Sequence, residues 1–180
     1  GGWVYSQTIT PPSGAAFSTS VDSDGERLVY GGRSSDVNLE TGRYSNAAYV
    51  YSIDADGSWE LEQELRTNGV PFIQDETVAV VVDGGTIAVG GNDRTSTGGG
   101  AFVEVFKYGE SAGTWDSAAT LDEPLASLYG FGCAIAMDGG VIIASSTYGN
   151  NERAGVSYRR DDATAARALL SHGDAESHRV

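Results

Sequence analysis

Short apolar runs, separated by glycine-rich and Asp-Gly turns, recur along the first 158 residues of the chain. Runs of this length, rich in Val, Ile, Tyr and Phe, favour β-strands over helices. The turns Asp24-Gly25, Asp83-Gly84 and Asp138-Gly139 each join two apolar runs and lie 59 and 55 positions apart. Because Asp-Gly between apolar segments is a strong hairpin signal, the pattern predicts three similar units of short antiparallel strands.

The three tryptophans follow the same period. Trp3, Trp59 and Trp115 are separated by 56 and 56 positions, and each is followed six positions later by Leu or Ile. Four short strands repeated about every 50 residues are typical of a β-propeller blade. One tryptophan per blade is expected to pack between neighbouring blades. Phe17 and Phe131, which begin the first and third units, are expected to have structural roles too.

The predicted fold is therefore all-β, with propeller blades of four antiparallel strands, about three blades in total and no closed ring. We expect an outer strand at residues 3–9, blades at 17–65 and 76–121, and a partial blade at 131–158. Residues 159–180 change composition and are expected to be an atypical tail, disordered or with a short helix. Since known propellers close with about four to eight blades, the leading interpretation is a fragment of a larger propeller. Self-association through open blade faces is the second.

The third unit carries a family resemblance. Its segment Phe131-Gly132-Cys133-Ala134-Ile135, the Asp-Gly turns, the Gly-Gly pairs and the Trp-to-Leu strands resemble the FG-GAP repeat of integrin alpha chains and other surface proteins. The resemblance implies a propeller that binds ligands at the cell surface or outside the cell. Only the third unit has Phe-Gly, and the Gly-Gly strands followed by an aromatic strand and Trp are also similar to kelch repeats.

The formal charge of −14 changes the range of partners. So acidic a chain repels phosphate backbones and anionic lipids, which argues against nucleic-acid binding and against membrane contact by this segment. Basic partners or divalent cations suit it better. No apolar run approaches the roughly 20 residues that a membrane helix needs. We expect an extracellular or cell-surface location.

Calcium is the one cofactor that the resemblance suggests, and none is required. FG-GAP repeats often hold calcium in an Asp-x-Asn-x-Asp-Gly-x-x-Asp hairpin, whereas the hairpins here are shorter. The candidate carboxylates are Asp22 and Asp24 in the first hairpin, and Asp54 and Asp56 before Trp59.

No catalytic motif accompanies the repeat. His172 and His178 lie beyond it and match no zinc-binding spacing. The stretch Ser52-Ile53-Asp54-Ala55-Asp56-Gly57-Ser58-Trp59 is similar to the Asp-box turn of sialidases, so a propeller glycan hydrolase stays an alternative. The prediction is a non-catalytic recognition or adhesion module, and an intracellular kelch-like scaffold is the other alternative.

Binding is expected in the long, varied loops of one propeller face, because rigid sheets that present variable loops are a common design for recognition. The partner would be a protein, a glycan, or the remaining blades of a larger propeller. The candidate loop residues are Arg33, Asp36, Glu40, Tyr44, Asn92, Asp93, Arg94, Tyr148 and Asn150.

Overall fold

The computed structural model describes residues 2–38, 43–72, 78–91, 102–122, 131–145, 155–159 and 167–170. Every regular element in these ranges is a β-strand. The strands are β1 (Ala16–Ser23), β2 (Arg27–Asn38), β3 (Arg43–Ile53), β4 (Trp59–Phe72), β5 (Ala79–Asp83), β6 (Thr86–Gly91), β7 (Phe102–Gly109), β8 (Thr114–Asp122), β9 (Ala134–Asp138), β10 (Val141–Ser145), β11 (Gly155–Arg159) and β12 (Arg167–Leu170).

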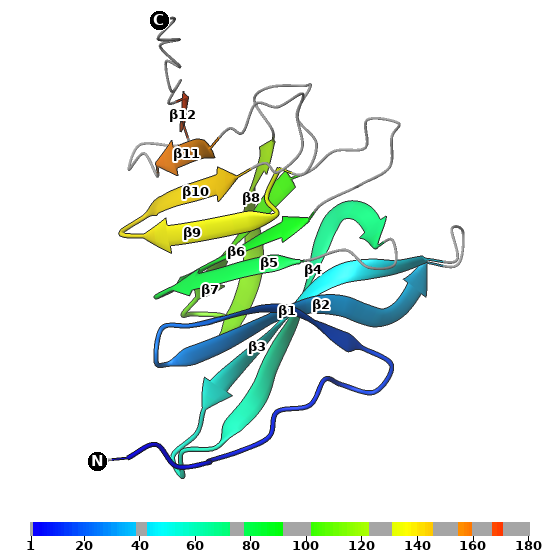
Figure 1. Ribbon diagram of the computed structural model, residues 1–180, viewed down its shortest axis with the longest axis vertical. Helices are drawn as coiled ribbons and strands as arrows, with labels where there is room; N and C mark the ends of the chain where they lie inside the picture. The colour runs from blue at the N-terminus through cyan, green and yellow to red at the C-terminus, as the bar shows by residue number, and fades with distance from the viewer. Residues whose placement is uncertain are drawn as a thin grey trace, which may run out of the picture.

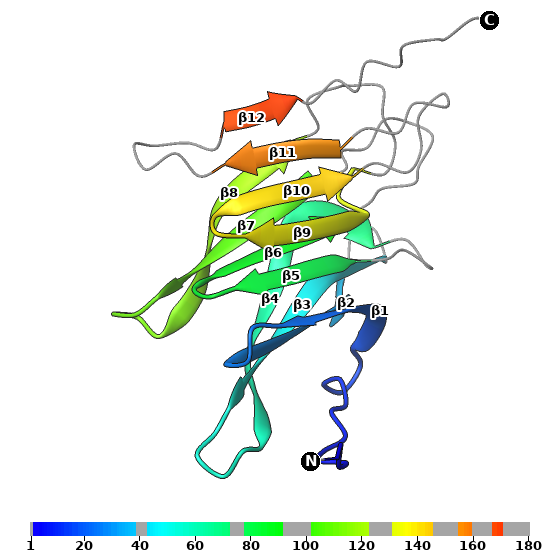
Figure 2. The same cartoon turned by 60° about the vertical axis from the view of Figure 1, so that its left-hand side comes forward.

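The strands form three antiparallel sheets of four, each a simple meander in chain order: β1 to β4, β5 to β8 and β9 to β12. Figures 1 and 2 show the sheets fanned one beside the next, with the first and third at opposite ends. The innermost strands lie together, since β1 contacts β5 and β5 contacts β9. The prediction of an all-β fold with blade-like four-stranded sheets is confirmed.

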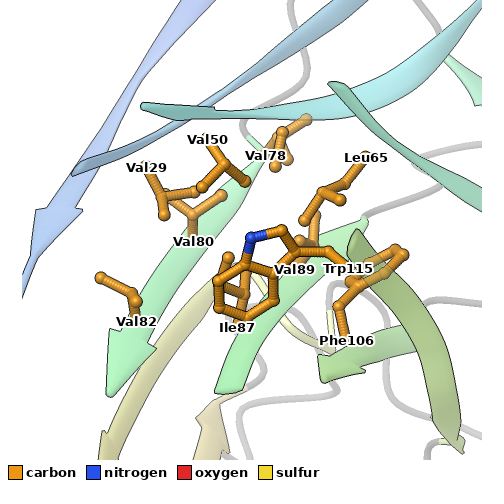
Figure 3. Close-up of a cluster of buried hydrophobic side chains, with 11 residues drawn as sticks. Val29, Val50, Leu65, Val78, Val80, Val82, Ile87, Val89, Phe106 and Trp115 are labelled. Atoms are coloured by element: carbon orange, nitrogen blue, oxygen red, sulfur yellow. The ribbon is translucent and has the colours of Figure 1, made fainter. Parts of the chain in front are cut away.

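The second sheet buries one face against the first sheet and its other face against the third. Between the first and second sheets, a valine-rich cluster surrounds Ile87, Phe106 and the Trp115 ring (Figure 3). A second cluster, which includes Phe131 and Tyr158, lies between the second and third sheets. Full burial of a side chain of this size stabilises the fold by about 1.5–3 kcal/mol relative to exposure. Trp115 and Phe131 thus each lie in a buried cluster between two neighbouring sheets.

Hydrogen bonds from main-chain amides to Asp carboxylates link neighbouring sheets, and glycines allow the sheets to approach closely. The Asp22 carboxylate of β1 accepts a hydrogen bond from the Val82 amide of β5 at 2.9 Å. The Gly139 amide donates to the Asp83 carboxylate at 3.0 Å in the next interface. A Cβ atom at Gly90 would collide with the carbonyl oxygen of Gly132, which lies just before the first strand of the third sheet. A side chain at this position would therefore force the second and third sheets apart.

The other two tryptophans differ from Trp115. Trp59 is half-buried on the outer side of the first sheet, where it packs against a cluster of Ala47, Tyr49 and Tyr51. Phe17 packs against the same cluster and stacks on Tyr30, with 4.4 Å between ring centroids. Trp3 is fully exposed at 105%, and residues 2–10 form no strand. The expected packing of Trp3 and the expected outer strand at 3–9 are corrected. The described part of the chain supplies no inner strands beside this segment, so neither the backbone nor the ring has a sheet to join.

The tail also differs from the expectation where it is described. Arg167–Leu170 forms β12, which pairs antiparallel with β11 between Val156 and Arg159. The free edge of β11 offers unpaired amide and carbonyl groups, and an extended segment satisfies them where a helix could not. None of the described residues forms a helix long and apolar enough to cross a membrane.

Candidate functional site

Three of the predicted loop residues come together where β2 ends and β3 begins. Arg33 and Asp36 lie on the last part of β2, and Tyr44 lies on the first part of β3. Here β2 and β3 pair antiparallel, with Arg33 opposite Asn46, and β2 has a bulge between Arg33 and Val37. A rigid four-stranded sheet thus fixes the backbone on which these side chains stand. The other predicted loop residues lie outside the described part of the chain: Glu40, Asn92, Asp93, Arg94, Tyr148 and Asn150.

A charged network joins Asp36 to residues that the sequence did not single out. The Arg66 guanidinium of β4 contacts the Asp36 carboxylate at 2.5 Å and the Glu64 carboxylate at 3.3 Å. The Ser34 hydroxyl donates to Glu64 at 2.5 Å and accepts from the Asp36 amide at 3.2 Å. We call Arg33, Ser34, Asp36, Tyr44, Glu64 and Arg66 the polar cluster.

The electrostatics of the polar cluster centre on Arg66. Partial burial alone would lower the pKa of its guanidinium, but the hydrogen bond and charge of Asp36, with the charge of Glu64, raise it above its usual value. Arg66 and Asp36 are both exposed, so their ion pair stabilises the fold by about 1 kcal/mol or less. Such a pair can be exchanged at little cost for contacts with another charged molecule.

An aromatic contact forms the other half of the polar cluster. The Arg33 guanidinium lies 4.0 Å from the centroid of the Tyr44 ring, within cation–π range. The buried Tyr49 hydroxyl donates to the Arg33 carbonyl at 2.6 Å and ties β3 to β2 beneath this pair. Burial, and then the nearby charge of Glu64, raise the pKa of Tyr49 well above its ordinary value. Tyr49 therefore stays neutral and acts as a fixed support.

One buried acceptor next to the polar cluster has no partner among the described residues. The Oδ1 atom of Asn46 is buried and makes no hydrogen bond there. Its amide nitrogen lies 3.1 Å from where a Cβ atom at Gly91 would stand, so the side chain points toward the second sheet. No pattern in the sequence pointed to this residue, because an Asn at the start of an apolar strand is indistinguishable from a turn residue.

The four candidate calcium ligands already serve the fold. Asp22 links the first two sheets, while Asp24 accepts from the amides of Glu26 and Arg27 at 3.0 and 2.8 Å. Asp54 and Asp56 both accept from the Ser58 amide, at 3.0 and 2.9 Å. Hydrogen bonding with the Ser58 side chain first, and then with the Asp54 side chain, lowers the pKa of Asp56.

Each candidate carboxylate therefore has at least one oxygen committed to its own turn or to the neighbouring sheet. In the ranges that the structure describes, no three His, Cys, Asp or Glu side chains gather as a metal site would require. Calcium binding stays a prediction of the sequence.

Comparison with known proteins adds no family to this picture. The chain matches no family model, and no curated protein sequence matches it either. The resemblance to FG-GAP and kelch repeats is thus an interpretation of the sequence pattern. What the residues can do has to be argued from the polar cluster itself.

Proposed function

We propose that this chain is a non-catalytic recognition module of a surface or secreted protein, and that it binds a protein or glycan ligand through the polar cluster. The observation that carries the proposal is the convergence of Arg33, Asp36 and Tyr44 at one end of a rigid sheet, joined there by Arg66. Guanidinium groups, carboxylates and an aromatic ring suit recognition of a polar surface.

The chemistry of the polar cluster favours binding over hydrolysis. A glycan hydrolase needs one carboxyl group that can give up a proton and a second that can attack or activate water. Here Asp36 and Glu64 share one guanidinium, and Ser34 also donates to Glu64. Both carboxylates are thus already engaged by groups of the chain itself, and no second pair of carboxyl groups completes such a site among the members of the polar cluster.

Labelled chain applied to an array of glycans and to an array of extracellular-matrix proteins tests the proposal. Saturable binding is expected on one of the two arrays. Arg33→Ala and Arg66→Ala should each weaken it by roughly tenfold or more, the scale of one recognition contact. Glu110→Ala is the matched control, because Glu110 is an exposed charge in the β7–β8 turn of the second sheet.

Two results would count against the proposal. The first is absence of saturable binding on both arrays, with the fold verified by circular dichroism. The second is an equal loss of binding in the Glu110→Ala control, because that loss would locate the contact away from the polar cluster.

A further inference from the structure

One contact between sheets occurs twice in the chain. The Gln63 side chain of β4 donates to the Trp115 carbonyl at 2.9 Å and accepts from the Trp115 amide at 2.8 Å. The Gln7 side chain makes the same pair of bonds with Trp59, at 3.0 and 2.8 Å. We call each pair a Gln–Trp clamp.

The sequence separation within both clamps is 52 residues. Gln63 lies on the outer strand of the sheet that precedes Trp115. By analogy, Gln7 has the position of a residue on the outer strand of a further sheet, one that would come before the first sheet. The segment around Trp3 forms no strand in the single chain, yet it occupies the position of the outermost strand of a blade, and the described residues supply no inner strands beside it.

The face of the first sheet beneath this segment matches a buried face of the second sheet. Val21 and Val80 both lie three positions before the Asp of their Asp-Gly turn, yet Val21 is 49% exposed and Val80 is 5% exposed. We call this the outer face of the first sheet. Within the described residues, Ile9 and Ala15 are the only apolar residues from outside the sheet that pack on it. The apolar and aromatic members of the face itself are Phe17, Leu28, Tyr30, Ala47, Tyr49, Tyr51 and Trp59.

The third sheet lies at the other end of the fan (Figure 1), and we call the face that it turns away from the second sheet the far face. Ile143 corresponds to Ala88 of the second sheet, but Ile143 is 50% exposed and Ala88 is fully buried. Its neighbours Ala136 and Ser157 pair with it across β9 and β11. Small side chains on this far face fit the large rings of the outer face of the first sheet, as packing of two sheets requires.

A cavity between the second and third sheets marks where the missing tryptophan would pack. It has a volume of about 550 Å³ and is lined by residues that include Thr86, Lys107 and Arg159. Thr86 occupies the same position in the second unit as Arg27 does in the first, because each lies three positions after the Asp of its Asp-Gly turn. Between the first and second sheets, the Arg27 guanidinium lies 5.1 Å from the centroid of the Trp115 ring.

In the third unit, the position 56 residues after Trp115 is Ser171, so this unit supplies no tryptophan ring to the cavity itself. The exposed Trp3 of another molecule has the right place in the repeat to supply it.

We propose that two copies of this chain associate head to tail. The outer face of the first sheet of each copy covers the far face of the third sheet of the other, and the Trp3 segment becomes the outer strand of that third sheet. Head-to-tail contacts close into a ring when the rotation permits. Two copies of the three described sheets give six blades, which lies within the range of about four to eight found in closed propellers.

In this dimer, the Trp3 segment of one copy replaces β12 of the other copy at the edge of β11. In the single chain, Ala168 of β12 pairs with Tyr158, and by the repeat Tyr5 of the second copy takes that place. Tyr5 and Val4 are both largely exposed in the single chain. Their burial and that of Trp3 favour the associated state.

Sedimentation velocity of the full chain across a wide concentration range tests the proposal. The expected species is a dimer of twice the 18.8 kDa chain mass. Val21→Arg on the outer face and Ile143→Arg on the far face should each weaken dimerisation by roughly tenfold or more. Both side chains are about half exposed in the single chain, so circular dichroism should show an unchanged fold.

Mixing the two variants distinguishes head-to-tail association from a contact between like faces. A mixture of Val21→Arg and Ile143→Arg copies keeps one intact interface, so it should form heterodimers more tightly than either variant dimerises alone. Glu110→Arg should dimerise like the unaltered chain.

A chain that stays monomeric at every concentration would overturn the proposal. So would variants that dimerise like the unaltered chain, or a mixture that associates no better than its components.

Discussion

At the scale of single residues, side-chain hydroxyl groups fix the position of the tyrosine-rich third strand. Tyr49 and Tyr51 are buried side by side on the outer face of the first sheet, and both donate to backbone carbonyls, of Arg33 and Thr10 respectively. A buried hydroxyl without a partner would cost about 1–3 kcal/mol. These bonds allow two polar rings to be buried at the positions where the second sheet has Glu104 and Phe106.

The raised pKa of Tyr49 predicts how stability changes in alkali. Unfolded tyrosine ionises near pH 10, and burial keeps the proton on the folded Tyr49 to higher pH. Above about pH 10 the folded state therefore binds more protons than the unfolded state. The stabilisation is complete below that pH and is lost as the pH rises.

Urea unfolding between about pH 8 and pH 11, bracketing the tyrosine pKa, measures this effect. The free energy of unfolding should fall more steeply above pH 10 in the unaltered chain than in Tyr49→Phe, by up to about 1.4 kcal/mol per pH unit. Tyr49→Phe also loses the bond to Arg33, which shifts the whole curve without changing its slope. Equal slopes would show that Tyr49 ionises normally in the folded chain.

At the scale of elements, the contacts between consecutive sheets decide how the strands are arranged. The Asp-Gly hairpins and strand alternation were readable because they depend on neighbours in sequence. The Gln–Trp clamps were not, since Gln7 and Gln63 look like ordinary polar positions on a strand. Their spacing of 56 positions, equal to that of the tryptophans, was the available signal.

The clamp between Gln63 and Trp115 can be tested by substitution. Gln63→Ala removes both bonds and leaves backbone groups of Trp115 without these partners, so it should destabilise the chain by about 1–3 kcal/mol. Gln63→Glu keeps the acceptor and should cost less. Gln7→Ala is the matched control, because the exposed Gln7 clamp supports no described sheet behind it and should cost well under 1 kcal/mol in the monomer.

Thermal or urea unfolding of dilute protein gives these differences directly. If Gln63→Ala and Gln7→Ala have the same small effect, the clamp does not hold the second sheet to the first.

At the scale of the whole molecule, the repeat predicted the sheets but not the fate of the end segments. The three sheets follow the predicted blades, with β4 running on to Phe72 beyond the expected end at residue 65. The predicted packing of Trp3 was wrong because it depends on inner strands that the described residues do not supply beside this segment. In the same way, Arg33 and Tyr44 were found from loop position, whereas Arg66 and Glu64 required the pairing of β3 with β4.

The central claim is that consecutive sheets stack so that a tryptophan is sealed between them. Fluorescence quenching by acrylamide in three variants that each keep one tryptophan, with the other two changed to Phe, tests it most directly in dilute protein. Trp115, 2% exposed, should be the most protected and emit at the shortest wavelength. Trp59 should be intermediate, and Trp3 should be quenched like a free side chain. Equal quenching of all three, or an accessible Trp115, would contradict the stacked arrangement.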